Sequence, residues 1–316
     1  MAFEAEFLDL MASAGIQTVD ADVRTEKKEF DEDFLQIVDS LGIQRDATLS
    51  IPRRLLETEV NALARFCVDF HIRLVSGEQL RGCLGVAPRQ LGKGGFGTTF
   101  LNLEKELVVK QAQNLEAFRS FIVEAKAMTL MAEHDGFQRL VGVCPERMCM
   151  VTRYAGHTLD AHVLGRLHTE QRMSVVRQVC NIVQSMHKHG LAHNDIKPAN
   201  VCVRMGAGGA RVTVIDFGLT MVAGTLPRLQ IQWNPRLPYA PEICGSERKG
   251  PCGCLSDVYA VGKLLQFVFS GNQQMPQLLR RWFSKSQEMS PRERQGLGSL
   301  LEALEQEKIR LLRRCY

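Results

Sequence analysis

The chain has 316 residues and contains no apolar run that approaches the roughly 20 residues needed to span a membrane. Its first segment, MAFEAEFLDLMASAG, includes three acidic residues and no basic stretch, so we expect neither a secretory signal nor a membrane partner. In a chain without such a signal, ten cysteines indicate reduced thiols. We therefore expect an intracellular protein, in the cytoplasm or the nucleus.

Strong net charge, internal repeats and low-complexity tracts are also missing. The formal net charge is only +4, and it gives no reason to expect a nucleic-acid partner. Cys252 and Cys254, with Cys244 nearby, suggest a zinc site, but no second cysteine pair follows at ligand spacing. We therefore favour ordinary loop thiols over zinc ligands.

The first 80 residues have apolar side chains at helical spacing and predict a helical N-terminal extension. Ser50 and Pro52 mark the start of its third helix. Glycines between Gly77 and Gly85 interrupt this periodicity, and we place a boundary there. The extension is expected to dock a partner protein or the rest of this chain.

From about residue 84 the pattern changes to short runs rich in β-formers, with longer helical stretches dominating later. The expected strands are Leu107–Lys110, Met148–Tyr154 and Arg211–Ile215. The expected helices are Leu115–Met131, Glu170–His189 and Ser256–Phe269. This order predicts an α+β fold with a small sheet-rich lobe followed by a larger helical lobe.

A glycine-rich stretch, LGKGGFGTTF, begins at Leu91. In a dinucleotide-binding fold the last glycine of such a motif opens a helix. Here Gly97 is followed by Thr98, Thr99 and Phe100, which favour a strand. We therefore expect a loop between two antiparallel strands, whose backbone N–H groups approach phosphate oxygens.

Two charged residues follow this loop. Lys110 ends an apolar strand, and Glu124 lies at the edge of the buried face of the next helix. A lysine in this position is normally a surface residue. The preceding glycine loop favours instead a buried ion pair that holds the ammonium group toward the phosphates of a nucleotide.

The stretch HGLAHNDIKPANVCV places Asp195, Lys197 and Asn200 on one short loop. A carboxylate can accept the proton of a substrate hydroxyl, an ammonium group can neutralise a phosphoryl group, and an amide oxygen can ligate a metal. Asp216, after the strand RVTVI, supplies a second carboxylate. These groups are the parts that phosphoryl transfer requires.

The ordered set of motifs resembles the eukaryotic-type protein kinase family, in its serine/threonine branch, over residues 84–316. It comprises the glycine loop, Val108-Val109-Lys110, Glu124, His193-Asn194-Asp195, Asp216-Phe217-Gly218, Ala240-Pro241-Glu242 and Ser256-Asp257-Val258-Tyr259. The resemblance implies a bilobal kinase fold, with an N-lobe over about 84–152 and a C-lobe over about 156–316. Residues 1–80 then form an extension before it.

The resemblance also implies ATP and Mg²⁺ as cofactors, protein substrates, and a role for each site residue. Catalysis is assigned to Asp195, Lys197 and Asn200, and Mg²⁺ to Asn200 and Asp216. The ATP-binding set is Leu91, Gly92, Lys93, Gly94, Gly95, Phe96, Gly97, Thr98, Thr99, Val108, Lys110, Glu124, Thr152, Arg153, Tyr154, Ala155 and Cys202. Glu242 is expected to pair with Arg294, and Asp257 to brace the catalytic loop. Lys197 points to serine or threonine as the acceptor.

The sequence departs from the family pattern at several positions. Asn194 replaces the arginine that in the family grips a phosphorylated activation loop. Between Asp216 and Glu242 the only hydroxyl side chains are Thr220, Thr225 and Tyr239. We therefore expect activity without loop phosphorylation, with the loop held by contacts of Leu226, Pro227, Trp233, Pro235 and Pro238.

Two further departures concern nucleotide and substrate. Thr99 stands where the family has a valine against adenine, which suggests modest nucleotide affinity. The stretch from Asp257 to Arg294 is short, so substrate selection is expected to involve the N-terminal helices. A compact kinase with a private extension resembles many virus-encoded kinases, so a viral origin is one hypothesis and a cellular origin stays open.

Two alternatives stay open. A pseudokinase would keep the fold as a scaffold that binds nucleotide or partner proteins, although the residues needed for transfer are all present. A small-molecule kinase of the aminoglycoside or choline type would share the catalytic stretch. Lys197-Pro198 and Ala240-Pro241-Glu242 favour a polypeptide substrate over a small molecule.

Overall fold

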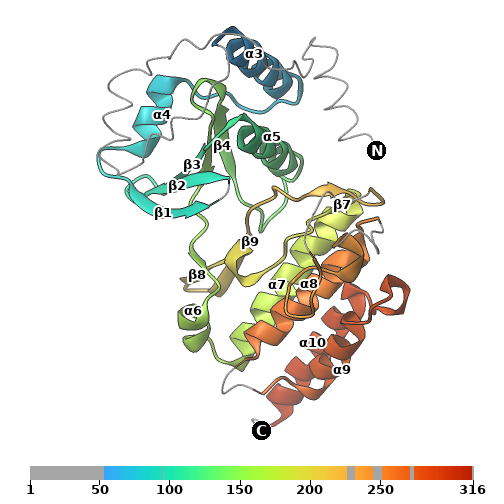
Figure 1. The fold of residues 1–316 in the computed structure, drawn as a ribbon. Helices are drawn as coiled ribbons and strands as arrows, with labels where there is room; N and C mark the ends of the chain where they lie inside the picture. Colours follow the sequence, from blue (N-terminus) through green and yellow to red (C-terminus); the bar gives the residue numbers. More distant parts are fainter. Residues whose placement is uncertain (1–52, 95, 226–231, 245–250, 271–273, 315–316) are drawn as a thin grey trace. The chain divides into compact units, whose positions relative to one another are not determined.

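The computed structural model describes residues 53–94, 96–225, 232–244, 251–270 and 274–314. The helices expected over residues 1–50, together with Ser50 and Pro52, lie outside this part. The chain forms two compact units (Figure 1). The smaller unit contains the described residues up to Thr129 and Leu140–Tyr154, and the larger unit contains Leu130–Arg139 and the residues from Ala155 onward. The chain therefore has the expected α+β composition, with β-structure early and helices late.

The smaller unit is built on a five-stranded antiparallel sheet with the strand order β1-β2-β3-β5-β4. The strands are β1 (Arg89–Gly94), β2 (Gly97–Asn102), β3 (Leu107–Ala112), β4 (Leu140–Cys144) and β5 (Cys149–Arg153). β-Branched residues in β2 and β3 bury one or both faces, whereas every described side chain of β1 is exposed. The expected glycine loop between antiparallel strands is confirmed, because β1 pairs with β2 on either side of it.

Helix α4 (Gly77–Leu84) occupies the segment in which the glycines predicted a break. A capping box explains the difference: Ser76 Oγ accepts from the backbone N–H of Gln79 at 3.2 Å, and Gln79 Oε1 accepts from that of Ser76 at 2.9 Å. Leu80 and Leu84, one turn apart, are buried in a cluster with side chains of β2, β3 and β5. Burial of this apolar pair outweighs the low helix propensity of glycine.

Helix α3 (Arg53–Asp69) and the segment after it complete the smaller unit. Leu63, Phe66 and Cys67 of α3 are almost fully buried. Beyond α3, the backbone of Arg73 and Val75 extends the sheet beside β4: Val143 N–H donates to Arg73 O at 2.9 Å, and Val75 N–H donates to Val143 O at 2.8 Å. Residues that the sequence assigned to a separate extension are thus part of the core of this unit.

Helix α5 (Leu115–Leu130) lies between β3 and β4 in the chain and carries Glu124. Buried residues on this helix include Phe118, Phe121, Ile122 and Ala125 at helical spacing. Figure 1 shows α5 beside the sheet of the smaller unit. The predicted helix Leu115–Met131 is confirmed to within one residue.

The larger unit is mainly helical. Its helices are α6 (Ala161–Gly165), α7 (Thr169–Lys188), α8 (Cys254–Val268), α9 (Gln277–Ser286) and α10 (Leu297–Arg314). α7 packs against α8, and α9 against α10 (Figure 1). Arg172, near the start of α7, donates to Val268 O at 2.6 Å and to Leu164 O at 2.7 Å, and so ties three helices together. No helix in the described ranges is long and apolar enough to cross a membrane.

Short strands position the loops of the larger unit. They are β6 (His157–Thr158), β7 (Leu191–Ala192), β8 (Val201–Gly206), β9 (Gly209–Val214) and β10 (Met221–Val222). β8 and β9 form a hairpin with β6 at its edge, and β7 pairs with β10. Ile215 N–H donates to Asn200 O at 3.0 Å, so the loop after β7 and the segment after β9 are joined at their ends.

Candidate active site

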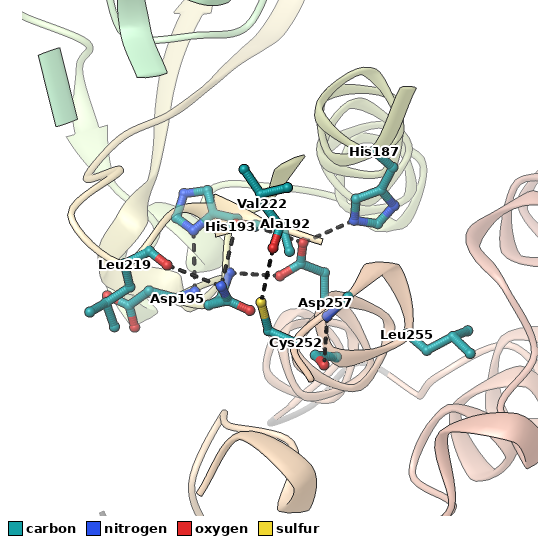
Figure 2. A network of polar contacts seen from close by, with 12 residues as sticks. His187, Ala192, His193, Asp195, Leu219, Val222, Cys252, Leu255 and Asp257 are labelled. Carbon is teal, nitrogen blue, oxygen red and sulfur yellow. Dashed lines mark hydrogen bonds and ion pairs between the residues drawn. The ribbon is translucent and has the colours of Figure 1, made fainter. Parts of the chain in front are cut away.

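The loop after β7 is held by Asp257, a fully buried residue of α8. Its two carboxylate oxygens accept the backbone N–H groups of His193 and Asn194, each at 2.8 Å. His187 Nε2 lies 2.9 Å from Asp257 Oδ2. Figure 2 shows Asp257 between His187 and the loop. The predicted brace is therefore confirmed, and it fixes the backbone immediately before Asp195.

Asn194 adopts a left-handed backbone conformation, with φ 62°, which asparagine tolerates better than most residues. Its side chain is buried, and its Nδ2 donates to Leu219 O at 3.0 Å. Leu219 follows the Asp216-Phe217-Gly218 motif. The neutral amide of Asn194 thus links the loop after β7 to the stretch from Asp216 to Glu242, which we call the activation segment.

The carboxylate of Asp195 is the centre of the polar network in the larger unit, and only 5% of the residue is exposed. Lys197 Nζ lies 2.9 Å from Oδ1 and 2.7 Å from Oδ2. Asn200 Nδ2 donates to Oδ2 at 2.8 Å and to the backbone oxygen of Asp195 at 2.9 Å. The three residues predicted for catalysis are therefore in direct contact.

Tyr239 is a fourth member of this network that the sequence did not predict. Its hydroxyl donates to Asp195 Oδ1 at 2.9 Å. Burial, followed by the charge of Asp195, raises the pKa of Tyr239, so the phenol stays protonated and remains a donor. In the sequence, Tyr239 stands out only by its position directly before Ala240-Pro241-Glu242. That position does not predict a contact with Asp195, which lies 44 residues earlier.

Asn200 and Asp216 have the donor set that suits Mg²⁺. Both Nδ2 bonds of Asn200 go to Asp195, which leaves its amide oxygen as a ligand. Asp216 is half-buried and has a left-handed backbone conformation, with φ 64°. One carboxylate and one amide oxygen match the few hard oxygen ligands that Mg²⁺ takes from a protein when phosphates and water supply the rest.

The three cysteines considered as zinc ligands differ in their surroundings: Cys244 and Cys252 are buried, and Cys254 is exposed. Cys244 and Cys252 are buried in an apolar cluster with Tyr259. Cys252 Sγ lies 3.7 Å from the backbone oxygen of Val222. Among the described side chains, no group of three or more His, Cys, Asp or Glu could hold a metal ion.

In the smaller unit, Lys110 and Glu124 form the predicted ion pair. Lys110 Nζ lies 2.6 Å from Glu124 Oε1, and the exposed fractions of the two side chains are 14% and 2%. A nearly buried glutamate needs a cationic partner, so the pair fixes α5 against β3. The Lys110 side chain keeps a small exposed part, whereas Glu124 is almost fully enclosed.

The glycine loop has the room that a phosphate needs. A Cβ atom added at Gly92 or Gly94 would meet no other atom within 4 Å, so packing does not require glycine at either position. Gly97 differs: it has φ 145°, and a Cβ atom there would overlap the carbonyl oxygen of Gln111. Gly97 therefore lets β2 pair closely with β3, and Gly92 and Gly94 present no side chain on the surface of β1.

The other residues predicted to bind ATP divide between the units. Val108 and Thr152 are register partners on β3 and β5 and are buried. Leu91 and Phe96 are exposed, at 44% and 59%. Cys202 is buried in the larger unit, and burial raises its pKa to about 12. Of the rest, the smaller unit contains Lys93, Thr98, Thr99, Arg153 and Tyr154, the larger unit contains Ala155, and Gly95 lies outside the described residues.

A second buried ion pair supports the site from the end of the activation segment. Arg294 donates to both carboxylate oxygens of Glu242, at 2.7 and 2.8 Å. Ser256 Oγ also donates to Glu242, at 2.9 Å. The predicted pairing of Glu242 with Arg294 is confirmed. It connects the segment that carries Tyr239 to α8 and to the turn before α10.

Comparison with known proteins places these features in one family. A family model described as "Protein kinase domain" matches residues 86–315. The chain is 29% identical over 203 residues to "Serine/threonine-protein kinase Pkn1" of Myxococcus xanthus. It is 26% identical over 197 residues to "Calcium-dependent protein kinase 14" of Arabidopsis thaliana, and 28% identical over 200 residues to "Serine/threonine-protein kinase SBK2" of Rattus norvegicus.

Each of these matches includes 58% of this chain but only part of the relative. The matched part is 28% of the bacterial protein, 36% of the plant protein and 54% of the rat protein. The helices α3 and α4 precede the region that the family model matches. The relatives come from a bacterium, a plant and a mammal, and the viral origin stays a hypothesis.

Proposed function

Because the chain belongs to the protein kinase family, we propose that it is a serine/threonine kinase that transfers the γ-phosphoryl group of ATP to a protein hydroxyl. One observation carries this proposal: the buried carboxylate of Asp195 contacts both Lys197 and Asn200. A carboxylate in this setting can orient a substrate hydroxyl and accept its proton. Lys197 can then stabilise negative charge on the transferred group.

ATP and Mg²⁺ are the cofactors of this proposal, as is general in the family. Mg²⁺ supplies charge neutralisation and alignment of the phosphates when it is bound. Asn200 and Asp216 would hold the metal, and Lys110 would contact the phosphates while paired with Glu124. Gly92 and Gly94, where an added Cβ atom would meet no other atom within 4 Å, would cover the same phosphates. The other residues predicted to bind ATP keep the roles that the family resemblance implies.

Serine or threonine as the acceptor is supported by Lys197, which accompanies the catalytic aspartate in that branch of the family. Two of the three relatives carry "serine/threonine-protein kinase" in their names. The position of Lys197 against both oxygens of Asp195 gives it a direct part in the site. A protein substrate is proposed on the same grounds, and its identity is open.

We also propose that the enzyme is active without phosphorylation of its activation segment. Thr220 is 3% exposed, so a phosphate there would have to be buried. Thr225 already donates to Val222 O at 2.7 Å, and Tyr239 donates to Asp195. Asn194 anchors the segment through Leu219 with a neutral side chain. Of the residues expected to hold the loop, Leu226 and Pro227 lie outside the described part.

The N-terminal extension is proposed to dock on the kinase domain itself. Glu59 of α3 lies 2.7 Å from Arg119 of α5. Lys126 of α5 lies 3.5 Å from the ring centroid of Phe70, just after α3. Since α5 also carries Glu124, α3 is in a position to stabilise the Lys110–Glu124 pair. The part of the extension before residue 53 lies outside the described residues, and its docking of a partner stays a prediction.

The proposal is tested with purified full-length chain, labelled ATP, Mg²⁺ and a generic basic protein. We expect label on serine or threonine of the protein. Asp195→Ala should lower the rate by at least about a thousandfold while nucleotide binding is kept. Lys110→Met should weaken both transfer and binding. Binding of ATP without transfer by the wild type would favour the pseudokinase alternative, and full activity of Asp195→Ala would refute the assigned base.

Treatment of the enzyme with a phosphatase before the assay tests the proposal that activity does not require phosphorylation of the activation segment. The treated enzyme should keep its activity, because Thr220 is buried and the hydroxyls of Thr225 and Tyr239 already donate within the protein. Mass spectrometry of the untreated enzyme identifies any phosphate between Asp216 and Glu242. If the treatment removes such a phosphate and also abolishes activity, phosphorylation-independent activity is refuted. The proposed kinase activity itself would still stand.

A further inference from the structure

The carboxylate of Asp195 has no acceptor position left for a substrate. A carboxylate offers about four lone-pair positions in total. Oδ1 accepts from Lys197 and Tyr239, each at 2.9 Å. Oδ2 accepts from Lys197 at 2.7 Å and from Asn200 at 2.8 Å. A hydroxyl that is to give its proton to Asp195 must therefore displace one of these donors.

The three donors differ in how readily they can leave. Asn200 is held by a second bond to the backbone oxygen of Asp195, at 2.9 Å. Lys197 carries a positive charge and bridges both carboxylate oxygens, which makes it the most strongly held of the three donors. Tyr239 is neutral and makes one bond, from a separate segment of the chain. Its hydroxyl is the donor that a substrate displaces most easily.

The segment around Tyr239 presents this hydroxyl to the base. Trp233 Nε1 donates to the backbone oxygen of Tyr239 at 3.2 Å. Lys263 Nζ, on α8, donates to Pro235 O at 2.8 Å. The Tyr239 ring packs on a buried cluster that includes Ala192 and Cys244. These contacts anchor the ring and backbone, so the hydroxyl can lose Asp195 without a change in the fold of the segment.

We propose that the hydroxyl of Tyr239 occupies the position on Asp195 that the substrate's serine or threonine hydroxyl takes during transfer. Tyr239 is then an internal competitor of the protein substrate. It also keeps water from that position while no substrate is bound. This inference rests on the proposed function, since only a kinase presents an acceptor hydroxyl to Asp195.

The test is Tyr239→Phe, which keeps the ring and removes the hydroxyl. With a basic protein as substrate, the KM for that protein should fall by roughly tenfold, the ratio expected for removal of one competing hydrogen bond to a charged group. The KM for ATP should stay the same. Hydrolysis of ATP by water, measured without protein substrate, should rise, because water can then reach Asp195.

Two further variants complete the test. Trp233→Phe removes the hydrogen bond to the backbone oxygen of Tyr239. It should lower the KM for the protein by a smaller factor than Tyr239→Phe, because the hydroxyl is still present but its backbone is less firmly held. Ser284→Ala removes an exposed hydroxyl of α9 that donates to Arg280 O at 3.2 Å, and it should leave the KM unchanged. Thermal unfolding and ATP binding verify that each variant is folded.

The outcomes separate this inference from the proposed function. A wild type that transfers no phosphoryl group overturns the proposed function itself. If the wild type is active and Tyr239→Phe leaves the KM for protein unchanged, the competitor role is wrong. A lower kcat with no rise in ATP hydrolysis also overturns it and would make Tyr239 a positioning residue instead.

Discussion

At the scale of single residues, the pKa of His193 is set by two opposing effects, its burial and the negative charges of nearby aspartates. The residue is fully buried, its ring centroid lies 5.2 Å from that of Phe217, and its Nδ1 accepts the backbone N–H of Asp195 at 3.2 Å. Burial lowers the pKa of His193, and this effect outweighs the charges of Asp257, Asp195 and Asp216, which raise it. The imidazole is therefore neutral in the folded protein.

This setting predicts how stability depends on pH. In the unfolded chain His193 binds a proton below about pH 6.5, while the folded state resists it. The contribution of His193 to the free energy of unfolding is therefore fully present above about pH 6.5. As the pH falls from there toward the lower pKa of the folded state, this contribution decreases by about 1.4 kcal/mol per pH unit. Urea unfolding between pH 7 and 5, on the wild type and His193→Gln, measures it.

The variant should have a flatter pH dependence over this window than the wild type. His162→Gln is the matched control, because His162 is exposed on α6; its pH dependence should follow that of the wild type. Equal slopes for the wild type and His193→Gln would contradict the prediction.

At the scale of elements, the contact between α3 and α5 yields a test by charge exchange. Glu59→Arg or Arg119→Glu places two like charges at a distance where the wild type has an ion pair of 2.7 Å. Either change should raise the KM for ATP by about fivefold or more, a cost of about 1 kcal/mol, because α5 carries Glu124. The double variant, which restores opposite charges, should recover most of the loss.

Hydrogen exchange provides the second readout for this contact. Amides of α5 should exchange faster in each single variant and return toward the wild-type rate in the double variant. Lys285→Glu is the control, since Lys285 is exposed near the end of α9 and its partner Glu288 lies just beyond that helix. Unchanged kinetics in both single variants would mean that α3 does not stabilise the Lys110–Glu124 pair.

The elements were predictable where local signals agreed. The apolar periodicity predicted α5, α7 and α8, and β-branched runs predicted β3, β5 and β9, because each of these has one or more buried faces. Helix α4 was missed, since three glycines suggested a break while the decisive signals, the capping box and the pair Leu80 and Leu84, depend on packing against the sheet. Tertiary burial outweighed propensity there.

At the scale of the whole molecule, the pair Glu242–Arg294 connects distant parts of the larger unit. The Arg294 side chain is 0% exposed, so Glu242→Gln leaves a buried guanidinium with a neutral partner. We expect a loss of about 3 kcal/mol or more in the free energy of unfolding, measured by urea or heat. Removing both charges, as Glu242→Gln with Arg294→Met, should cost less than Glu242→Gln alone; an equal or greater loss would contradict this.

The site illustrates what sequence order reveals and what it leaves out. Contacts within a short loop, such as Asp195 with Lys197 and Asn200, follow from spacing. Lys110–Glu124 was predicted from the preceding glycine loop and the helix pattern, whereas Glu242–Arg294, 52 residues apart, was predicted through the family resemblance. The bond from Tyr239 to Asp195 had neither source, because it depends on the path of the activation segment in three dimensions.

The addition of residues 73–75 beside β4 has a practical consequence. A chain shortened to begin at residue 86, where the family match starts, would lose the strand that satisfies Val143 and the helix that covers Phe100 and Val109. Unpaired backbone groups at a sheet edge, next to an exposed hydrophobic surface, promote aggregation of the chain. We therefore expect the solubility of this chain in vitro to depend on a segment that lies outside the residues that the family model matches.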